Sequence, residues 1–579
     1  MHDFSTLPAS AVDFANWTWE QVETYYTELS ARILSHQTIS AWLTDWSHLT
    51  ALVVECGARL SVAASMDTTD AAAQERHQQF FTRIAQPAQA YYDQLLQRWL
   101  ESGLVAPGYE RVFSQLRASQ RRYCAANQPL EAQVEALLAD FWHVVGEQTV
   151  EWQGQTLAIG WGSEAVRAGL SHEEGERFWG REAARRRADR EVLHRIWREL
   201  FDLRGKMAAN AGYPDYFTYR WEQLGRPDYT PANCLAFHQA IAEIAVPAAS
   251  RVYKRRRAQL GVESLRPWDL VRRPPDLAPL QPFQTAAELL DGCSRILHRI
   301  EAQFGTHFDH LRTAGLLDVE TRPHKMQGGF ARHYAVTRQS FISLNARGQP
   351  NDVLDLIHEA GHAMSIIASR HLSFLQLSAA SGEGGAEWTE LTSQATTMLA
   401  LPYLAASQGG FYRPAEAARA EIDYLEKEVL LFLPEAAVVD AFQHWAYTHP
   451  ALGRDPLECE REWLRLEERY IPDVDWPGLE TERATNWLTH GLIFSQPLFF
   501  IEYAISLLGA LQIRRNAMRD PVGALAAYQR ALRLSGTGAT LPELYQAAGA
   551  RLSLDAATLA EMVGLVEGRI VELEQLGIE

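Results

Sequence analysis

Apolar residues recur every three or four positions along most of the chain, which is the spacing of one buried face of an α-helix. The pattern runs from Trp17 to about Arg190, and its first stretch, TWEQVETYYTELSARIL, opens with the Thr–x–x–Gln signal of a helix start. A second helical block spans about 191–259, and a proline-rich segment at 265–282 predicts an ordered loop. The pattern predicts a mainly α-helical protein with an N-terminal helical domain over 1–190 and a second domain over 191–579.

The periodicity changes between His324 and Asp352. This segment contains the pair Gly328 and Gly329 and short alternating runs such as SFISLN, which predict a few short strands. Helical spacing returns at once in LDLIHEAGHAMSII, residues 354–367. We therefore expect a small β-sheet next to this helix.

Composition and charge narrow the range of partners. The 579 residues are 47% hydrophobic, which suffices for a large core and two lobes. A net charge of −18 argues against nucleic acid or an anionic membrane as a partner.

No signal peptide and no membrane-spanning apolar run is evident. The five cysteines are scattered without CxxC spacing, so neither disulfides nor a thiolate metal site is indicated. These features predict a cytoplasmic protein, and they leave the oligomeric state open.

The helix at residues 354–367 carries a candidate metal site. His358 and His362 are four residues apart and share one helix face, so both imidazoles can reach one ion. Glu359 lies about 100° round the helix, close enough to meet a water molecule on that ion. This is the HExxH pattern of zinc hydrolases. The alternative is a pair of polar residues on a half-buried helix.

A catalytic zinc ion takes three protein ligands and leaves one position open. The following helix supplies Glu387 and Glu390, and Glu383 lies in the glycine-rich loop before it. Spacing alone leaves the third ligand undecided, and an exposed acidic helix face is the alternative.

HEAGHA followed by AEWTELTSQ resembles the M3 family of zinc oligopeptidases, in the branch of oligoendopeptidase F and the PZ-peptidases. The segments GKMAANAGYPDY, SLRPWDL, KMQGGF and FIEYAISLLGALQ extend the resemblance over nearly the whole chain. The family's Glu–x–x–Ser motif matches Glu390 and Ser393, which implies Glu390 as third ligand of one zinc ion per chain. The resemblance also implies two helical lobes around a deep channel for short unfolded peptides, with residues 191–579 as the catalytic domain.

The chemistry that follows is hydrolysis with Glu359 as general base. In the family, a C-terminal segment supplies donors to the oxyanion, and Tyr503 matches its last tyrosine. Leu492 stands at a histidine position, and Phe499 and Phe500 stand at a tyrosine pair. His490 is a candidate substitute.

A further departure from the family lies near the metal. Relatives carry a glutamate seven residues after the third ligand, where this chain has Thr397. Asp355 or Glu387 is a candidate to orient a ligating histidine in its place.

An extended peptide is normally held against the edge of a sheet. Arg338 to Asn345, RQSFISLN, is predicted to be that edge, and the glycines at 328 and 329 would allow close backbone approach. Candidate substrate-binding residues are Gly328, Gly329, His333, Phe341 and Ser343. The alternative is a strand that merely supports the histidine helix.

The leading hypothesis is a zinc-dependent endopeptidase acting on short peptides. The altered C-terminal segment favours a second hypothesis, specialised hydrolysis of a modified peptide or amide. A non-catalytic peptide-binding relative is the third, although Glu359 would then have no purpose.

Overall fold

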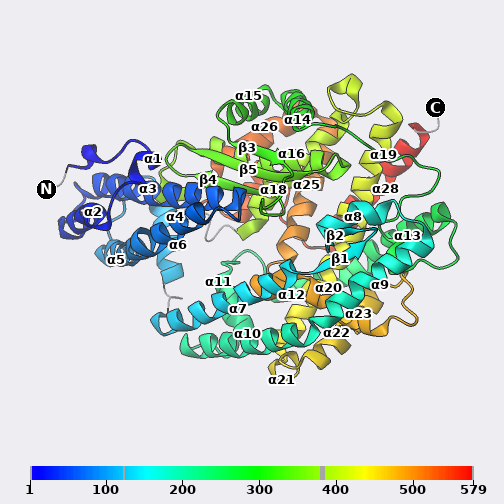
Figure 1. Ribbon diagram of the computed structural model, residues 1–579. Coiled ribbons are helices and arrows are strands. Elements are labelled where there is room, and N and C mark those ends of the chain that lie inside the picture. The colour runs from blue at the N-terminus through cyan, green and yellow to red at the C-terminus, as the bar shows by residue number, and fades with distance from the viewer. Residues whose placement is uncertain (1–2, 121–123, 378–384, 577–579) are drawn as a thin grey trace. The chain divides into compact units, whose positions relative to one another are not determined.

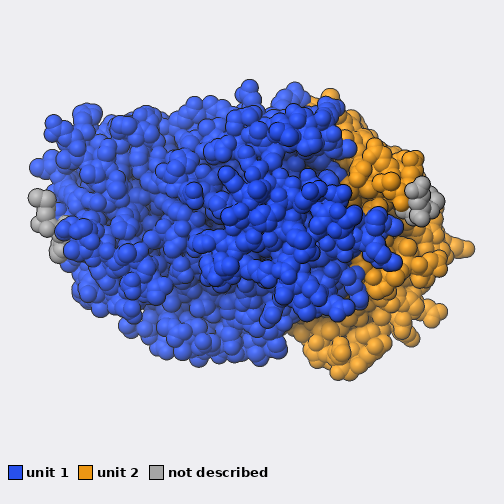
Figure 2. All heavy atoms as spheres, turned by 90° about the horizontal axis from the view of Figure 1, so that it is seen from above, with its two compact units in different colours: residues 1–121, 281–417, 509–552 blue, residues 122–280, 418–508, 553–579 orange. Residues whose placement is uncertain are grey.

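The computed structural model describes residues 3–120, 124–377 and 385–576. Contacts divide the chain into two compact units (Figure 2). Unit 1 comprises residues 1–121, 281–417 and 509–552, and unit 2 comprises residues 122–280, 418–508 and 553–579. Both are built mostly from helices (Figure 1), which confirms the predicted mainly α-helical class. The boundary at residue 190 stays a prediction, because these units follow contacts and not the order of the chain.

The N-terminal helices of unit 1 surround an aromatic core. Trp42, Trp46 and Trp99 are almost completely buried there. The predicted helix start at Thr18 is confirmed, because its backbone N–H donates to the Gln21 side chain at 2.8 Å. The helices are α1 (Ala11–Phe14), α2 (Trp19–Ala31), α3 (Ile39–Met66), α4 (Ala71–Phe80), α5 (Gln86–Ser102) and α6 (Glu110–Gln120).

Helix α3 departs from the expectation that no segment has membrane-spanning character. Among the described residues it is the one helix that is long and apolar enough, by length and composition, to cross a membrane. The mean hydropathy of its most apolar 18-residue stretch is 1.4. Half of that stretch is buried inside the protein, and the core helix of a soluble protein passes the same test.

A three-stranded sheet lies at the centre of unit 1. Its order is β3 (Leu317–Glu320), β5 (Gln339–Ala346), β4 (Phe330–Tyr334), with β3 parallel and β4 antiparallel to β5. The strands expected before the histidine helix are confirmed, and Figure 1 shows them beside α16 (Pro350–Ala368). The prediction that β5 is an exposed edge is wrong. Strands pair with it on both sides, and residues 340–344 are all buried.

The remaining helices of unit 1 surround this sheet and α16. They are α14 (Ala286–Ile300), α15 (Ala302–Thr313), α18 (Gly385–Ala400), α26 (Pro521–Leu534) and α27 (Leu541–Ala547). Two helices run along the chain from one unit into the other, namely α19 (Pro414–Leu425) and α25 (Ile501–Arg519).

In the described residues of unit 2, the regular structure is helical apart from the hairpin β1 (Thr149–Trp152) and β2 (Gln155–Ala158). A π-helical segment precedes Pro247, and another precedes Pro434, because proline lacks the N–H that an α-helix needs. The helices are α7 (Gln128–Gly146), α8 (Trp161–Ala168), α9 (His172–Ala188), α10 (Arg190–Asn210), α11 (Tyr216–Gln223), α12 (Pro231–Ala240), α13 (Val246–Leu260), α20 (Phe432–Thr448), α21 (Pro450–Gly453), α22 (Pro456–Tyr470), α23 (Glu480–Ala484), α24 (Gly491–Ser495) and α28 (Ala556–Leu576).

Candidate metal centre

Helix α16 is fixed at its start and along one side. The Asp352 carboxylate accepts the backbone N–H groups of Arg347 at 2.7 Å and Gln349 at 2.8 Å, which satisfies donors at the helix N-terminus. The apolar residues Val353, Ile357, Ala360 and Met364 of this helix are buried. The opposite face presents the HExxH side chains, which remain partly accessible.

His358, His362 and Glu390 come together as the motif predicts. His358 Nε2 is 3.4 Å from Glu390 Oε2, and His362 Nε2 is 3.9 Å from Glu390 Oε1. One ligand atom from each residue lies within 4.8 Å of the others. Zinc–ligand bonds of about 2.0–2.2 Å place tetrahedral donors roughly 3.3–3.6 Å apart, so side-chain adjustments would close this site on one ion. Two imidazoles and one carboxylate are a donor set that suits zinc.

The acidic residues of α18 are not an exposed face. Glu387 is 1% exposed, and the Glu390 side chain is 15% exposed. The Glu387 carboxylate lies against the backbone of Gly385 and is not part of the ligand cluster. Glu383 lies outside the described residues. Among the described acidic residues of this region, Glu390 is the one that lies with the two histidines.

The contact between α16 and α18 depends on two small residues. A Cβ on Gly361 would stand 2.7 Å from Ser393 Cα and 2.9 Å from Thr396 Oγ1, so the helices meet almost backbone to backbone. The Ser393 hydroxyl donates to the Glu390 carbonyl at 2.9 Å and needs no partner on α16. This close crossing brings Glu390 to the two histidines. The sequence contained both residues, in HEAGH and Glu–x–x–Ser, but their packing role was missed.

Electrostatics prepares the site for ligation and proton transfer. Burial, together with the neighbouring His358, lowers the pKa of His362 to about 4, so its ring is neutral at pH 7 and offers a lone pair. Burial raises the pKa of the Glu359 carboxyl to about 6. A nearby dication would lower this pKa and favour the carboxylate that a general base requires.

The KMQGGF segment is fastened beside Glu359. The buried Lys325 ammonium donates to Asp318 Oδ1 at 2.9 Å and to the Leu344 carbonyl at 2.7 Å. The Asn345 amide donates to the carbonyls of Met326 at 2.9 Å and Gly328 at 3.0 Å. These bonds hold the loop before β4.

The glycines of this loop approach the general base. Gly328 has a φ of +98°, a conformation that favours glycine. A Cβ on Gly329 would lie 2.9 Å from Leu344 Cδ1 and 3.7 Å from Glu359 Oε1. The backbone at Gly329 therefore passes next to the Glu359 carboxylate. The two glycines were predicted from the sequence, whereas the anchoring roles of Lys325 and Asn345 were not.

The other proposed substrate residues are placed less favourably. Phe341 and Ser343 are buried in the central strand, so the edge argument that selected them no longer applies. His333 lies on the outer strand β4, with its Nδ1 3.3 Å from the Gln339 carbonyl. Burial, reinforced by Arg338, lowers the pKa of His333 to about 4.

The support behind the two histidines is uneven. Burial acts to lower the pKa of His358, but the hydrogen bond and charge of Glu390 raise it, and the charges of Glu359 and Asp355 add smaller contributions in the same direction. Thr397 donates to the Ser393 carbonyl at 3.2 Å. His362 Nδ1 is buried and has no hydrogen-bond partner within the described part of the chain. Thr397 therefore bonds within its own helix, and it does not take the place of the carboxylate that normally orients a ligating histidine.

The C-terminal candidates belong to unit 2. The Tyr503 ring contacts Phe499 and Phe500, with centroid distances of 5.4 and 5.7 Å. His490 packs against Trp463 at 5.1 Å, and burial lowers the pKa of His490 to about 4. Leu492, Phe499 and Phe500 are only partly buried, so they are not ordinary core residues. The oxyanion roles of Tyr503 and His490 stay predictions.

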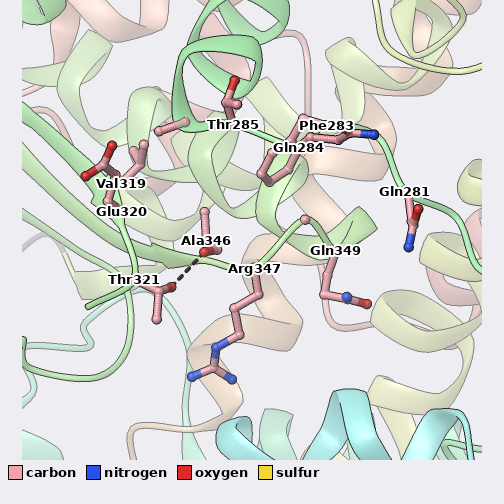
Figure 3. A pocket seen from close by; sticks show the side chains of 12 residues that line it. Gln281, Phe283, Gln284, Thr285, Val319, Glu320, Thr321, Ala346, Arg347 and Gln349 are labelled. Atoms are coloured by element: carbon pink, nitrogen blue, oxygen red, sulfur yellow. Dashed lines mark hydrogen bonds between the residues drawn. The ribbon is translucent and has the colours of Figure 1, made fainter. Parts of the chain in front are cut away.

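A separate pocket of about 550 Å³ lies at the start of α16 (Figure 3). Phe283, Thr321 and Arg347 are among its lining residues, and the Thr321 hydroxyl donates to the Ala346 carbonyl at 2.7 Å. Eight helical residues, or about 12 Å, separate Pro350 from His358. The pocket contains none of the metal-centre residues.

Comparison with known proteins identifies the family and supports the fold. The profile of peptidase family M3 matches residues 176–564. The structure of PZ peptidase A with an inhibitor is 19% identical with a TM-score of 0.84, covering 98% of this chain and 99% of that one. A structure assigned to oligoendopeptidase F is 20% identical with a TM-score of 0.85, covering 99% of each chain. Another so assigned, from Bacillus anthracis, is 19% identical with a TM-score of 0.80, covering 96% and 97%. No curated protein matched the sequence.

Proposed function

Because the chain belongs to peptidase family M3, we propose that it is a zinc-dependent endopeptidase that hydrolyses internal bonds of short unfolded peptides in the cytoplasm. The observation that carries the proposal is the cluster of His358, His362 and Glu390, with Glu359 beside it on α16. These three residues would hold one zinc ion per chain. When bound, zinc would supply Lewis acidity toward water and the substrate carbonyl.

Glu359 acts as the general base. Its carboxylate accepts a proton from the attacking water and then passes that proton to the leaving amine. The position of Gly329 supports a substrate path along β4, the outer strand nearest Glu359. A peptide paired with that strand would run past Gly329 and therefore close to the Glu359 carboxylate. Tyr503 is the proposed donor to the oxyanion, with His490 as the second candidate.

The test combines zinc content with cleavage of a mixed quenched-fluorescent peptide library. We expect the wild type to bind catalytic zinc and cleave, and His358→Ala or Glu390→Ala to lose that zinc. Glu359→Gln should retain zinc and lose about 100-fold to 10,000-fold in turnover, because only the proton acceptor is removed. Cleavage at the wild-type rate by Glu359→Gln would contradict the mechanism.

A second candidate function is favoured by one observation. Phe499 and Phe500 surround Tyr503 with rings that lack hydroxyl groups, and both are partly accessible. Absence of cleavage of the library by the zinc-loaded protein would favour a specialised hydrolysis of a modified peptide or amide over general endopeptidase activity. Losing one oxyanion donor typically slows acyl transfer by about 100-fold to 1,000-fold.

A further inference from the structure

Unit 2 contains a second cluster of metal-ligating side chains, between helices α12 and α20. Cys234 and His238 are four residues apart on α12, and Asp440 and His444 are four residues apart on α20, so each pair shares one helix face. None of the four residues is more than 5% exposed. One ligand atom each from Cys234, Asp440 and His444 lies within 4.8 Å of the others.

Protein hydrogen bonds satisfy only part of this cluster. His238 Nε2 donates to Asp440 Oδ2 at 2.8 Å. His444 Nε2 stands 3.4 Å from the same oxygen without forming a hydrogen bond. Asp440 Oδ1 and His444 Nε2 are both buried and lack a hydrogen-bond partner in the described ranges. Leaving a buried polar atom without a hydrogen bond destabilises the fold, so two such atoms in one cluster point to a missing ligand.

The surroundings suit a closed site for a dication. The His444 ring packs against Phe217 at 4.8 Å and Trp221 at 6.2 Å, which gives the cluster an apolar wall. The charge of Arg226 acts on Asp440, and this guanidinium is paired with Glu502. A thiolate at Cys234 and the carboxylate of Asp440 would together carry a charge that one divalent ion neutralises.

We propose that Cys234, Asp440 and His444 bind a divalent transition-metal ion of the zinc type, while His238 orients Asp440 through its hydrogen bond. Sulfur and nitrogen donors favour zinc over calcium or magnesium, which prefer oxygen ligands. On binding, the thiol proton leaves to solvent and the sulfur becomes a metal ligand. The ion joins α12 to α20 and serves structure, because the cluster is buried. CxxC spacing did not reveal this site, since its ligands come from helices about 200 residues apart.

The experiment separates this ion from the one in the candidate active centre. Full-length protein is produced with excess zinc and a non-thiol reductant, and metal is counted in the wild type, in His358→Ala/Glu390→Ala, and in that double variant with Cys234→Ser added. We expect two ions, one ion and none. Cys459→Ser is the matched control, because Cys459 is another buried cysteine of unit 2 whose thiol donates to the Gly453 carbonyl at 3.2 Å.

Cobalt(II) exchange identifies the ligands. The double variant should retain the near-ultraviolet thiolate-to-cobalt charge-transfer band, Cys234→Ser should abolish it, and Cys459→Ser should leave it unchanged. A folded double variant that binds no ion or lacks the band would overturn the proposal, even if Cys234→Ser fails to fold. Failure of the catalytic proposal would instead appear as an unchanged metal count in His358→Ala/Glu390→Ala.

Discussion

Replacing Gly361 by alanine probes the close crossing of α16 and α18. The new methyl group would stand 2.7 Å from Ser393 Cα, whereas carbon atoms in contact are ordinarily about 3.5–4.0 Å apart. The shortfall is about 1 Å. Because backbone atoms of α18 receive the clash, a side-chain rotation cannot relieve it. The helices must separate.

We expect Gly361→Ala to weaken zinc binding more clearly than it lowers the free energy of unfolding. Overpacking costs about 1–3 kcal/mol, and alanine recovers about 1 kcal/mol over glycine in a helix, so the net loss of unfolding free energy is about 0–2 kcal/mol. Glu390 is one turn from Ser393 and moves with it. A bond of about 2.0–2.2 Å to zinc cannot follow a displacement of about 1 Å. We expect zinc affinity to fall at least about tenfold, which corresponds to about 1.4 kcal/mol.

The assay is competition with a chelator for zinc, combined with denaturant unfolding of the same samples. Gly564→Ala is the control, because Gly564 lies in helix α28 with open space around its Cβ position. It should gain about 1 kcal/mol and keep its zinc. Wild-type zinc affinity in a folded Gly361→Ala would refute the packing explanation.

The remaining predictions concern the oxyanion, the glycine loop and pH. Tyr503→Phe should reduce turnover more than peptide binding, since its hydrogen bond is expected chiefly in the transition state; steady-state kinetics would show equal losses if the residue is structural. Asn345→Ala removes both bonds that fasten the loop at Gly328 and should raise KM several-fold with zinc content unchanged, so an unaltered KM would argue against a substrate path there. Burial lowers the pKa of His333 in the folded protein to about 4, below its ordinary 6.5. The unfolded chain therefore binds a proton at this residue more readily, so the free energy of unfolding is highest above pH 6.5 and declines as pH falls toward 4. His333→Gln should therefore flatten the decline in unfolding free energy across this range by up to about 3 kcal/mol, and urea titrations with parallel pH profiles for both proteins would contradict this.

Local pattern was enough to predict most elements and both histidines of the candidate metal centre, because helix periodicity and i,i+4 spacing are properties of short segments. It was not enough to choose between Glu387 and Glu390. These residues are three apart on one helix and differ little in direction, so the family resemblance decided. In the structure, Glu390 reaches the histidines because α18 crosses α16 at Gly361. That contact depends on two helices, and no single segment encodes it.

The error over β5 has a related cause. The SFISLN run identifies a strand correctly, but whether a strand is central or at an edge depends on its partners. Here β3 precedes β5 by about 20 residues and pairs parallel to it, while β4 pairs on the other side. The near-continuous burial of residues 340–344 is typical of a central strand, and the two serines within it obscured that signal.

The dependence on contacts between segments also explains why one group of candidate metal ligands could be predicted from the sequence and the other could not. In HExxH, one helix supplies two ligands and the base, so five consecutive letters contain most of the chemistry. At the second cluster each helix supplies one i,i+4 pair, Cys234 with His238 and Asp440 with His444, and such pairs are common by chance. Their meaning arises only when α12 packs against α20 and buries all four side chains away from water. The spacing of these residues alone could arise by chance. What marks the cluster as a candidate site is that two of its polar atoms are buried without a hydrogen-bond partner in the described residues.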